Sequence, residues 1–188
     1  MPEQLPRKNE SQIEPSLDAG QTIPILESTP ATLRSLLAPL PPAWLDFREE
    51  PDAWSPRMVL VHLIHNERTN WMPRARIILS AEGERRFPPF RQMPDPGEID
   101  DRYVGTMLTR SESLRRKNLG ALHGLDLKPD DYNRTAEHPV LGTVTLGQLL
   151  AAWVVHDLNH VHQIVKSVAK VQAEAVGPWR GNLAILGL

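Results

Sequence analysis

The 188-residue sequence contains no cysteine. This absence excludes disulfide bonds, thiolate metal ligands and a cysteine nucleophile, and it leaves the redox compartment open. No stretch approaches the roughly 18 apolar residues that a membrane-spanning helix requires. Residues 1–21 also contain no apolar run that could form the core of a signal peptide. We therefore expect a cytoplasmic protein that does not cross a membrane.

Neither sign of charge dominates the composition. The formal net charge is −2 at pH 7 and the pI is about 6.4, so nothing indicates a polyanionic partner. The sequence shows no basic stripe with interleaved aromatic residues, and we expect no binding to nucleic acid. The basic run RSESLRRKN (110–118) has acidic residues close by and predicts a solvent-exposed helix face.

Several catalytic signatures are missing. The sequence has no Gly-rich phosphate loop and no Gly-x-Ser-x-Gly elbow. The Glu-x-x-His spacing of di-iron bundles is also absent. The stretch HDLNH (156–160) has the histidine spacing of zincin proteases, but Asp157 stands where those enzymes have their general-base glutamate. These classes of active site are therefore excluded.

Apolar residues recur at steps of three and four in four segments, which predicts four helices. Their expected ranges are approximately 30–47, 56–80, 99–114 and 145–168. Ser55 followed by Pro56 is a good start for the second helix, and Thr145 with Gln148 forms a capping box for the fourth. Pro73 predicts a kink in the second helix.

The pattern as a whole predicts an all-α protein, a four-helix bundle formed by residues 25–188. No strand-like alternation of any length occurs, and residues 142–145 predict at most a brief extended segment. Residues 1–24 are rich in Pro, Glu, Gln and Ser, which is typical of a flexible arm. The apolar tail VGPWRGNLAILGL (176–188) is expected to pack back on the bundle.

Three of the seven histidines lie close together in HDLNHVHQI (156–164). His156 and His160 are four residues apart and share the inner face of the helix, whereas His162 points elsewhere. A buried imidazole needs a partner for each ring nitrogen, and a divalent metal can satisfy two that converge. His62, on the inner face of the second helix, offers a third ligand. Three neutral imidazoles would leave a fourth position for water or substrate.

Other residues are brought near these histidines by helical spacing. His65 follows His62 by one turn and is expected to line the pocket, or to supply a fourth ligand if the helix is distorted. Candidate catalytic helpers, for each of which a plain surface role is an open alternative, are Asn66, Asp157 and Asn159. The tryptophans expected to wall the pocket are Trp153 and Trp179.

Four stretches of the sequence together resemble the DinB/YfiT-like superfamily of metalloenzymes. They are WSPRMVLVHLIHNE, HPVLGTVTLGQLL, HDLNHVHQI and GPWRGNLAIL. The resemblance covers approximately residues 27–188 and implies metal ligands at His62, His156 and His160. The family commonly has a small residue at the position of His162, which we interpret as an outer-face or supporting residue and not as a ligand.

The resemblance also implies a function. It predicts a divalent ion, zinc or nickel, and a small-molecule substrate. Some members resemble metal-dependent thiol S-transferases, so a low-molecular-weight thiol is a candidate cosubstrate. An enzyme of transferase or hydrolase type, a non-catalytic metal-binding bundle and a metal-free bundle stay open as alternatives at this point. A homodimer through exposed faces of the bundle is a further expectation.

Overall fold

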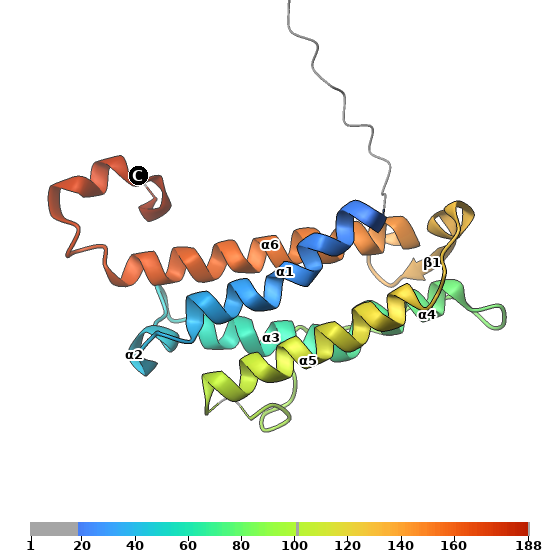
Figure 1. The fold of residues 1–188 in the computed structure, drawn as a ribbon, viewed down its shortest axis with the longest axis horizontal. Helices are drawn as coiled ribbons and strands as arrows, with labels where there is room; N and C mark the ends of the chain where they lie inside the picture. The colour runs from blue at the N-terminus through green and yellow to red at the C-terminus, as the bar shows by residue number, and fades with distance from the viewer. Residues whose placement is uncertain (1–18, 101, 188) are drawn as a thin grey trace, which may run out of the picture.

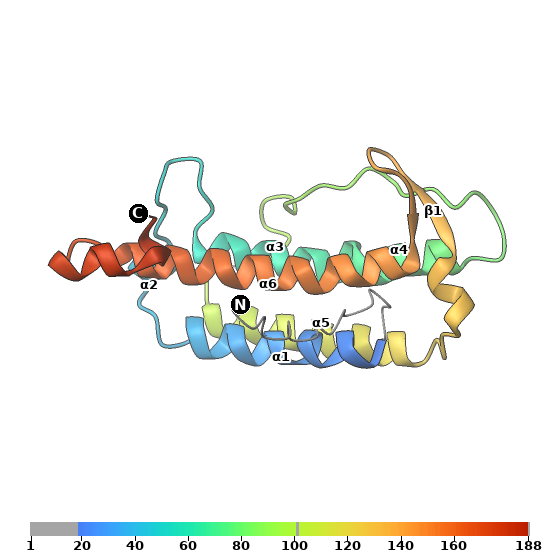
Figure 2. The same ribbon diagram turned by 90° about the horizontal axis from the view of Figure 1, so that it is seen from above.

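The computed structural model describes residues 19–100 and 102–187. Its long helices are α1 (Ala19–Leu37), α3 (Pro56–Thr69) continued by α4 (Trp71–Leu79), α5 (Val104–His123) and α6 (Leu146–Val171). Both α1 and α3 pack on α5 and on α6, so the helices close a ring. Figure 2 shows α1 and α5 in one layer and α3 and α6 in the other. The predicted four-helix bundle is confirmed (Figure 1).

A layer of buried polar side chains divides the bundle core into two apolar clusters. One cluster surrounds Trp71 and Trp153, and the other surrounds Leu60 and Ile64. The buried polar residues come from all four helical rods and are Thr29, His62, His65, Asn66, Glu67, Asn70, Ser111, Arg115, Asn118, Asp157 and His160. Burying so many polar groups is costly unless they are paired, and this middle layer is therefore where function is to be sought.

The first helix begins earlier than the sequence pattern predicts. α1 starts at Ala19 and contains Pro24 and Pro30, whereas the apolar spacing predicts a start near Pro30. Because proline has no N–H, Pro30 leaves the carbonyl of Leu26 without its helical partner. The guanidinium of Arg115 supplies the missing donor, with Nη1 2.7 Å from the Leu26 oxygen. The Arg115 side chain, from another helix, thus donates to the Leu26 carbonyl in place of the N–H that Pro30 lacks.

The predicted arm, residues 1–24, overlaps this helix. Its last residues belong to α1, and residues 1–18 lie outside the described part of the chain. Within the described part, no helix is both long enough and apolar enough to cross a membrane.

The helix starts predicted at Ser55 and Thr145 are confirmed. The Ser55 side chain accepts from the N–H of Met58, and Thr145 forms a reciprocal capping box with Gln148. The kink between α3 and α4 falls at Asn70, three residues before Pro73, where the proline disrupts the preceding turn.

The predictions for α5 need two corrections. The spacing of Ile99, Tyr103 and Met107 predicts an inner position for Tyr103 in a helix that already includes Ile99. The helix begins only at Val104, and Tyr103 before it is 68% exposed. The basic run 110–118 is not a purely solvated face, because Arg115 and Asn118 are buried. Carboxylate and carbonyl oxygens of Leu26, Glu67 and Asp157, on three other helices, accept hydrogen bonds from these two side chains and offset the cost of burying them.

The segment between α5 and α6 forms a hairpin, of which the sequence pattern predicted only the second strand, as a brief extended segment at residues 142–145. After a turn of 3₁₀ helix, β1 (Thr135–His138) pairs antiparallel with β2 (Gly142–Thr145), with Thr135 opposite Thr145. The His138 Nδ1 accepts from the backbone N–H groups of Val140 and Leu141, and Gly142 has a positive φ of 74°. Four residues per strand are too few for alternation to be recognised in the sequence.

The hairpin also anchors the long loop between α4 and α5. The backbone N–H of Phe87 donates to the carbonyl of Glu137, and the N–H of Glu137 donates to the carbonyl of Arg85. The first part of this loop is thereby attached to the hairpin, and Arg91 and Gln92 further along it contact His65 and His62 of α3.

The C-terminal tail packs back on the bundle only in part. The tail forms two short 3₁₀ turns, Gly177–Asn182 and Ala184–Leu186. The second turn packs on α6 and buries Leu186. Trp179 is 73% exposed. The expectation that this tryptophan walls the pocket is therefore wrong.

Candidate metal centre

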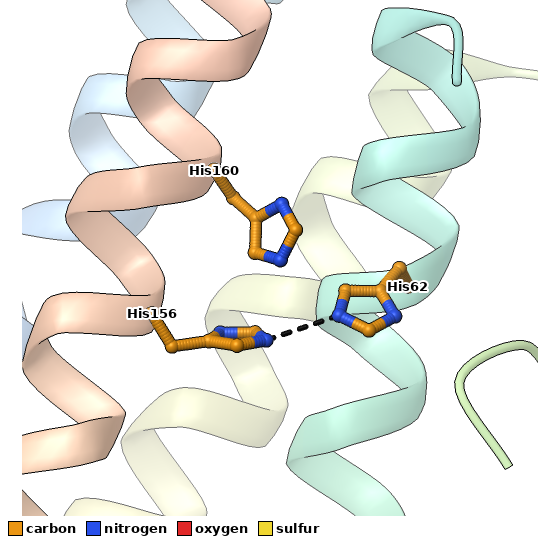
Figure 3. Close-up of side chains that lie close together, drawn as sticks. All are labelled: His62, His156 and His160. Carbon is orange, nitrogen blue, oxygen red and sulfur yellow. Dashed lines mark hydrogen bonds between the residues drawn. The ribbon is translucent and has the colours of Figure 1, made fainter. Parts of the chain in front are cut away.

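Three imidazoles from two helices meet in the middle layer of the bundle. His62 comes from α3, and His156 and His160 come from successive turns of α6 (Figure 3). One potential ligand atom from each side chain lies within 4.8 Å of the other two. The Nε2 atoms of His62 and His156 are 3.0 Å apart. The structure therefore brings together the three residues that helical spacing selects.

Helical spacing explains this arrangement. On α6, the fully buried Trp153 and Ile164 lie on the same face as the two histidines, at steps of three and four residues. His162 is exposed on another side of α6, as its spacing predicts.

Two of the imidazoles are oriented by carbonyl oxygens. The Nδ1 of His62 lies 2.6 Å from the backbone oxygen of Gln92, and the Nδ1 of His160 lies 2.9 Å from the side-chain oxygen of Gln163. A carbonyl oxygen can only accept, so each Nδ1 carries the proton and each Nε2 presents its lone pair. Metal-binding histidines in proteins are usually held in this way.

The third imidazole, that of His156, is held mainly by ring contacts. Trp71 meets it edge to face, with the ring centroids 5.0 Å apart. Its Nδ1 is buried and has no hydrogen-bond partner among the described residues. Since an unpaired buried polar atom costs about 1–3 kcal/mol, His156 is placed for its Nε2 atom and not for stability.

Burial keeps all three imidazoles uncharged. It lowers the pKa of His62 to about 4 and that of His156 to about 3, and neighbouring histidines add to both shifts. Burial also lowers the pKa of His160. At pH 7 the rings are therefore neutral, which is the form that binds metals.

The donor set fits a divalent metal ion with an open coordination position. Within residues 19–100 and 102–187, no fourth histidine or carboxylate joins the group. His65 does not, because its Nε2 donates to the backbone oxygen of Arg91 and its ring packs on Phe90. Three neutral nitrogen ligands suit zinc and comparable ions, and three-ligand sites are typical of catalysis.

The other predicted site residues lie in different environments. Asn66 adjoins the histidines, because its Nδ2 donates to the carbonyl of His62 and lies 3.0 Å from His62 Nε2. Asp157 is fully buried in an ion pair, and Asn159 is exposed. Trp153 stacks behind Trp71. Of the proposed helpers, the structure thus places only Asn66 beside the three imidazoles.

Several residues of the site were not predicted from the sequence. Trp54 and Trp71 wall the histidines, with the Trp54 ring 4.8 Å from that of His62. Gln163 could have been found, since it lies three residues after His160 in the stretch HDLNHVHQI, which is one of the four that carry the family resemblance. The Gln92 carbonyl gives no sequence signal, because every residue has one.

A buried ion cluster fixes α3, α5 and α6 next to the histidines. Arg115 lies 2.8 Å from a carboxylate oxygen of Glu67 and 2.7 Å from one of Asp157. Asn118 and the Trp153 Nε1 also donate to Glu67. Burial disfavours the charged guanidinium, but the two carboxylates outweigh this effect and hold the pKa of Arg115 above its ordinary value. Asp157 directly follows His156, so the cluster sets the rotation of α6.

The role of Gln163 leads to a first prediction. Replacing Gln163 with leucine removes the acceptor that orients His160, and we expect the affinity for a divalent metal to fall by about 10- to 100-fold. The melting temperature of the metal-free protein should change little, since Gln163 is half-buried. Competition with a chromogenic chelator measures the affinity. Unchanged affinity would show that this hydrogen bond does not orient a ligand.

Comparison with known proteins identifies the family. The family model of the DinB superfamily matches residues 25–164. The chain therefore belongs to the DinB superfamily. No curated protein matches the sequence.

Two solved structures have similar folds. YfiT from Bacillus subtilis, described as a probable metal-dependent hydrolase with an unusual four-helix bundle topology, superposes with a TM-score of 0.67 at 19% identity, covering 90% of this chain and 94% of that chain. TT2238, described as a four-helix bundle protein, matches with a TM-score of 0.47 at 22% identity, covering 77% and 95% of the two chains. The likeness to YfiT shows that the bundle fold is shared.

Proposed function

We propose that this protein is a divalent-metal-dependent enzyme, a hydrolase or a thiol S-transferase, whose ion is held by His62, His156 and His160. The observation that carries the proposal is the orientation of the rings. Two Nδ1 atoms are bound to carbonyl oxygens, which leaves Nε2 lone pairs inside one buried cluster. Membership of the DinB superfamily and the description of YfiT as a probable metal-dependent hydrolase support it.

The surrounding side chains have distinct parts in this proposal. His62, His156 and His160 would hold the zinc or nickel ion, which would make a nucleophile available at neutral pH by lowering the pKa of a bound water or thiol. Trp54 and Trp71 limit the access of bulk water from two sides. The Asn66 amide lies at the edge of the cluster with its Nδ2 3.0 Å from His62 Nε2. With that Nε2 bound to a metal, the N–H that faces it would be free to donate to a substrate oxygen. A protein cysteine is not required for either reaction.

The ligand number favours an enzyme over a purely structural metal site. Structural zinc sites are normally closed by four protein ligands, whereas three residues form the group in the described chain. The ion cluster of Arg115 already ties α3, α5 and α6 together, so a metal is not needed to join these helices.

Metal analysis combined with activity assays tests the proposal. The purified protein should bind about one equivalent of zinc or nickel. It should turn over either activated esters and amides, or 1-chloro-2,4-dinitrobenzene with glutathione, bacillithiol or mycothiol. Turnover is expected to require the metal and to be lost on His156→Ala but kept on His162→Ala, which alters an exposed histidine of the same helix. Absence of both metal binding and turnover would overturn the proposal.

A further inference from the structure

A cavity lies next to His65, one turn along α3 from His62, between α4 and residues 88–91 of the following loop. It measures about 260 Å³, and its lining includes His65, Thr69, Arg74, Ile77, Phe90 and Arg91. Three prolines complete a wall that is mostly apolar. The cavity is separate from the metal centre. Of the residues in the proposed ligand group, only His62 lies on α3, and the His65 side chain that lines the cavity is hydrogen-bonded to the backbone oxygen of Arg91.

Arg74 gives the cavity its chemical character. The guanidinium carbon lies 4.8 Å from the ring centroid of Phe87 and 5.2 Å from that of Phe90, so two aromatic rings hold the cation in place. No carboxylate forms an ion pair with Arg74 in residues 19–100 and 102–187, in contrast to the neighbouring Arg91, which is paired with Asp95. Burial lowers the pKa of Arg74. A half-buried cation without a counter-ion is unfavourable unless a ligand supplies the charge.

The position of the cavity links it to the loop that orients His62, one of the three proposed metal ligands. Arg91, in the cavity wall, accepts from His65 through its backbone oxygen, and the next carbonyl, that of Gln92, accepts from His62. A molecule seated against Phe90 and Arg91 would therefore touch the loop that sets the His62 ring.

We infer that this cavity binds a small organic anion, whose carboxylate or phosphate group pairs with Arg74 and whose apolar part packs on Phe90 and the prolines. An arginine presents a planar fork of donors that matches either oxyanion, and the aromatic rings hold this fork ready. Apolar walls with one placed charge are typical of small-molecule sites. The inference does not depend on metal binding by the histidines.

Calorimetric titration of the full-length protein tests the inference. Phenyl phosphate or benzoate should bind at least tenfold more tightly than benzamide, which has the same ring without the charge. Phenyl phosphate should also bind more tightly than inorganic phosphate, which lacks the apolar group. Comparison of phenyl phosphate with benzoate distinguishes a phosphate site from a carboxylate site. These measurements need no variant, so they remain decisive if a substitution impairs folding.

Two arginine variants locate the site. Arg74→Gln should weaken binding of the preferred anion at least tenfold with metal content unchanged, whereas Arg76→Gln, two residues away on the exposed side of α4, should leave it as in the wild type. Binding of both phenyl phosphate and benzoate no tighter than that of benzamide, or unchanged affinity of the preferred anion in Arg74→Gln, would overturn the inference. Because metal content is measured separately, failure here is distinguishable from failure of the proposed enzyme function.

Discussion

Replacing His156 with alanine is expected to abolish stoichiometric metal binding and with it all metal-dependent turnover. Two imidazoles that remain on different helices bind a divalent ion far more weakly than three. The melting temperature of the metal-free variant should stay within about 3 °C of the metal-free wild type. The reason is that the removed ring is only half-buried and carries an unpaired Nδ1.

The matched control for this variant is His162→Ala. It alters a histidine on the same helix that is exposed and outside the group of three, so metal content and turnover should equal those of the wild type. Elemental analysis and thermal unfolding after dialysis against chelator give the two readouts. Retention of metal by His156→Ala, or its loss in His162→Ala, would contradict the assignment.

Replacing Arg115 with methionine is expected to have the largest effect on stability. The substitution leaves the carboxylates of Glu67 and Asp157 buried without their cation, and it deprives the Leu26 carbonyl of its donor. Breaking a buried ion cluster in this way costs about 3–5 kcal/mol of unfolding free energy. For a chain of this length the melting temperature should fall by roughly 6–20 °C.

The adjacent Arg116 provides the control. It is exposed, and Arg116→Met should change the unfolding free energy by no more than about 0.5 kcal/mol. Chemical denaturation of both variants measures the difference. If Arg115→Met unfolded within about 1 kcal/mol of the wild type, the buried cluster would not be what fixes α6 against α3 and α5.

The parts of the fold that were predicted from sequence are those governed by local spacing and capping. Four amphipathic segments predicted the bundle, and the hydroxyls of Ser55 and Thr145 marked two helix starts to the residue. The start of α1 could not be predicted, because the helix passes Pro30 with help from the contact of Arg115 with the Leu26 carbonyl, which joins residues 89 positions apart in the chain. The burial of Arg115 could not be predicted either, because its partners come from three other helices that are distant in the sequence.

In the candidate site, too, the features that depend on local spacing could be predicted and those that depend on distant contacts could not. The spacing of His156 and His160 on one helix face, together with His62 on another helix, predicted the group that the structure brings together. The orienting carbonyl of Gln92 depends on the path of a loop, which leaves no mark in the sequence. Asp157 was a reasonable helper by position, but its side chain turns to Arg115. Helix rotation was thus predictable, whereas the choice of partners for each polar group was not.

Location of the metal by anomalous diffraction tests the central claim most directly. Crystals of the purified protein loaded with zinc or nickel, measured at the absorption edge of that metal, should show one main peak. We predict that it lies about 2.0–2.2 Å from one nitrogen of each of His62, His156 and His160. A peak bound by only one of these histidines, or the absence of any peak between α3 and α6, would contradict the account.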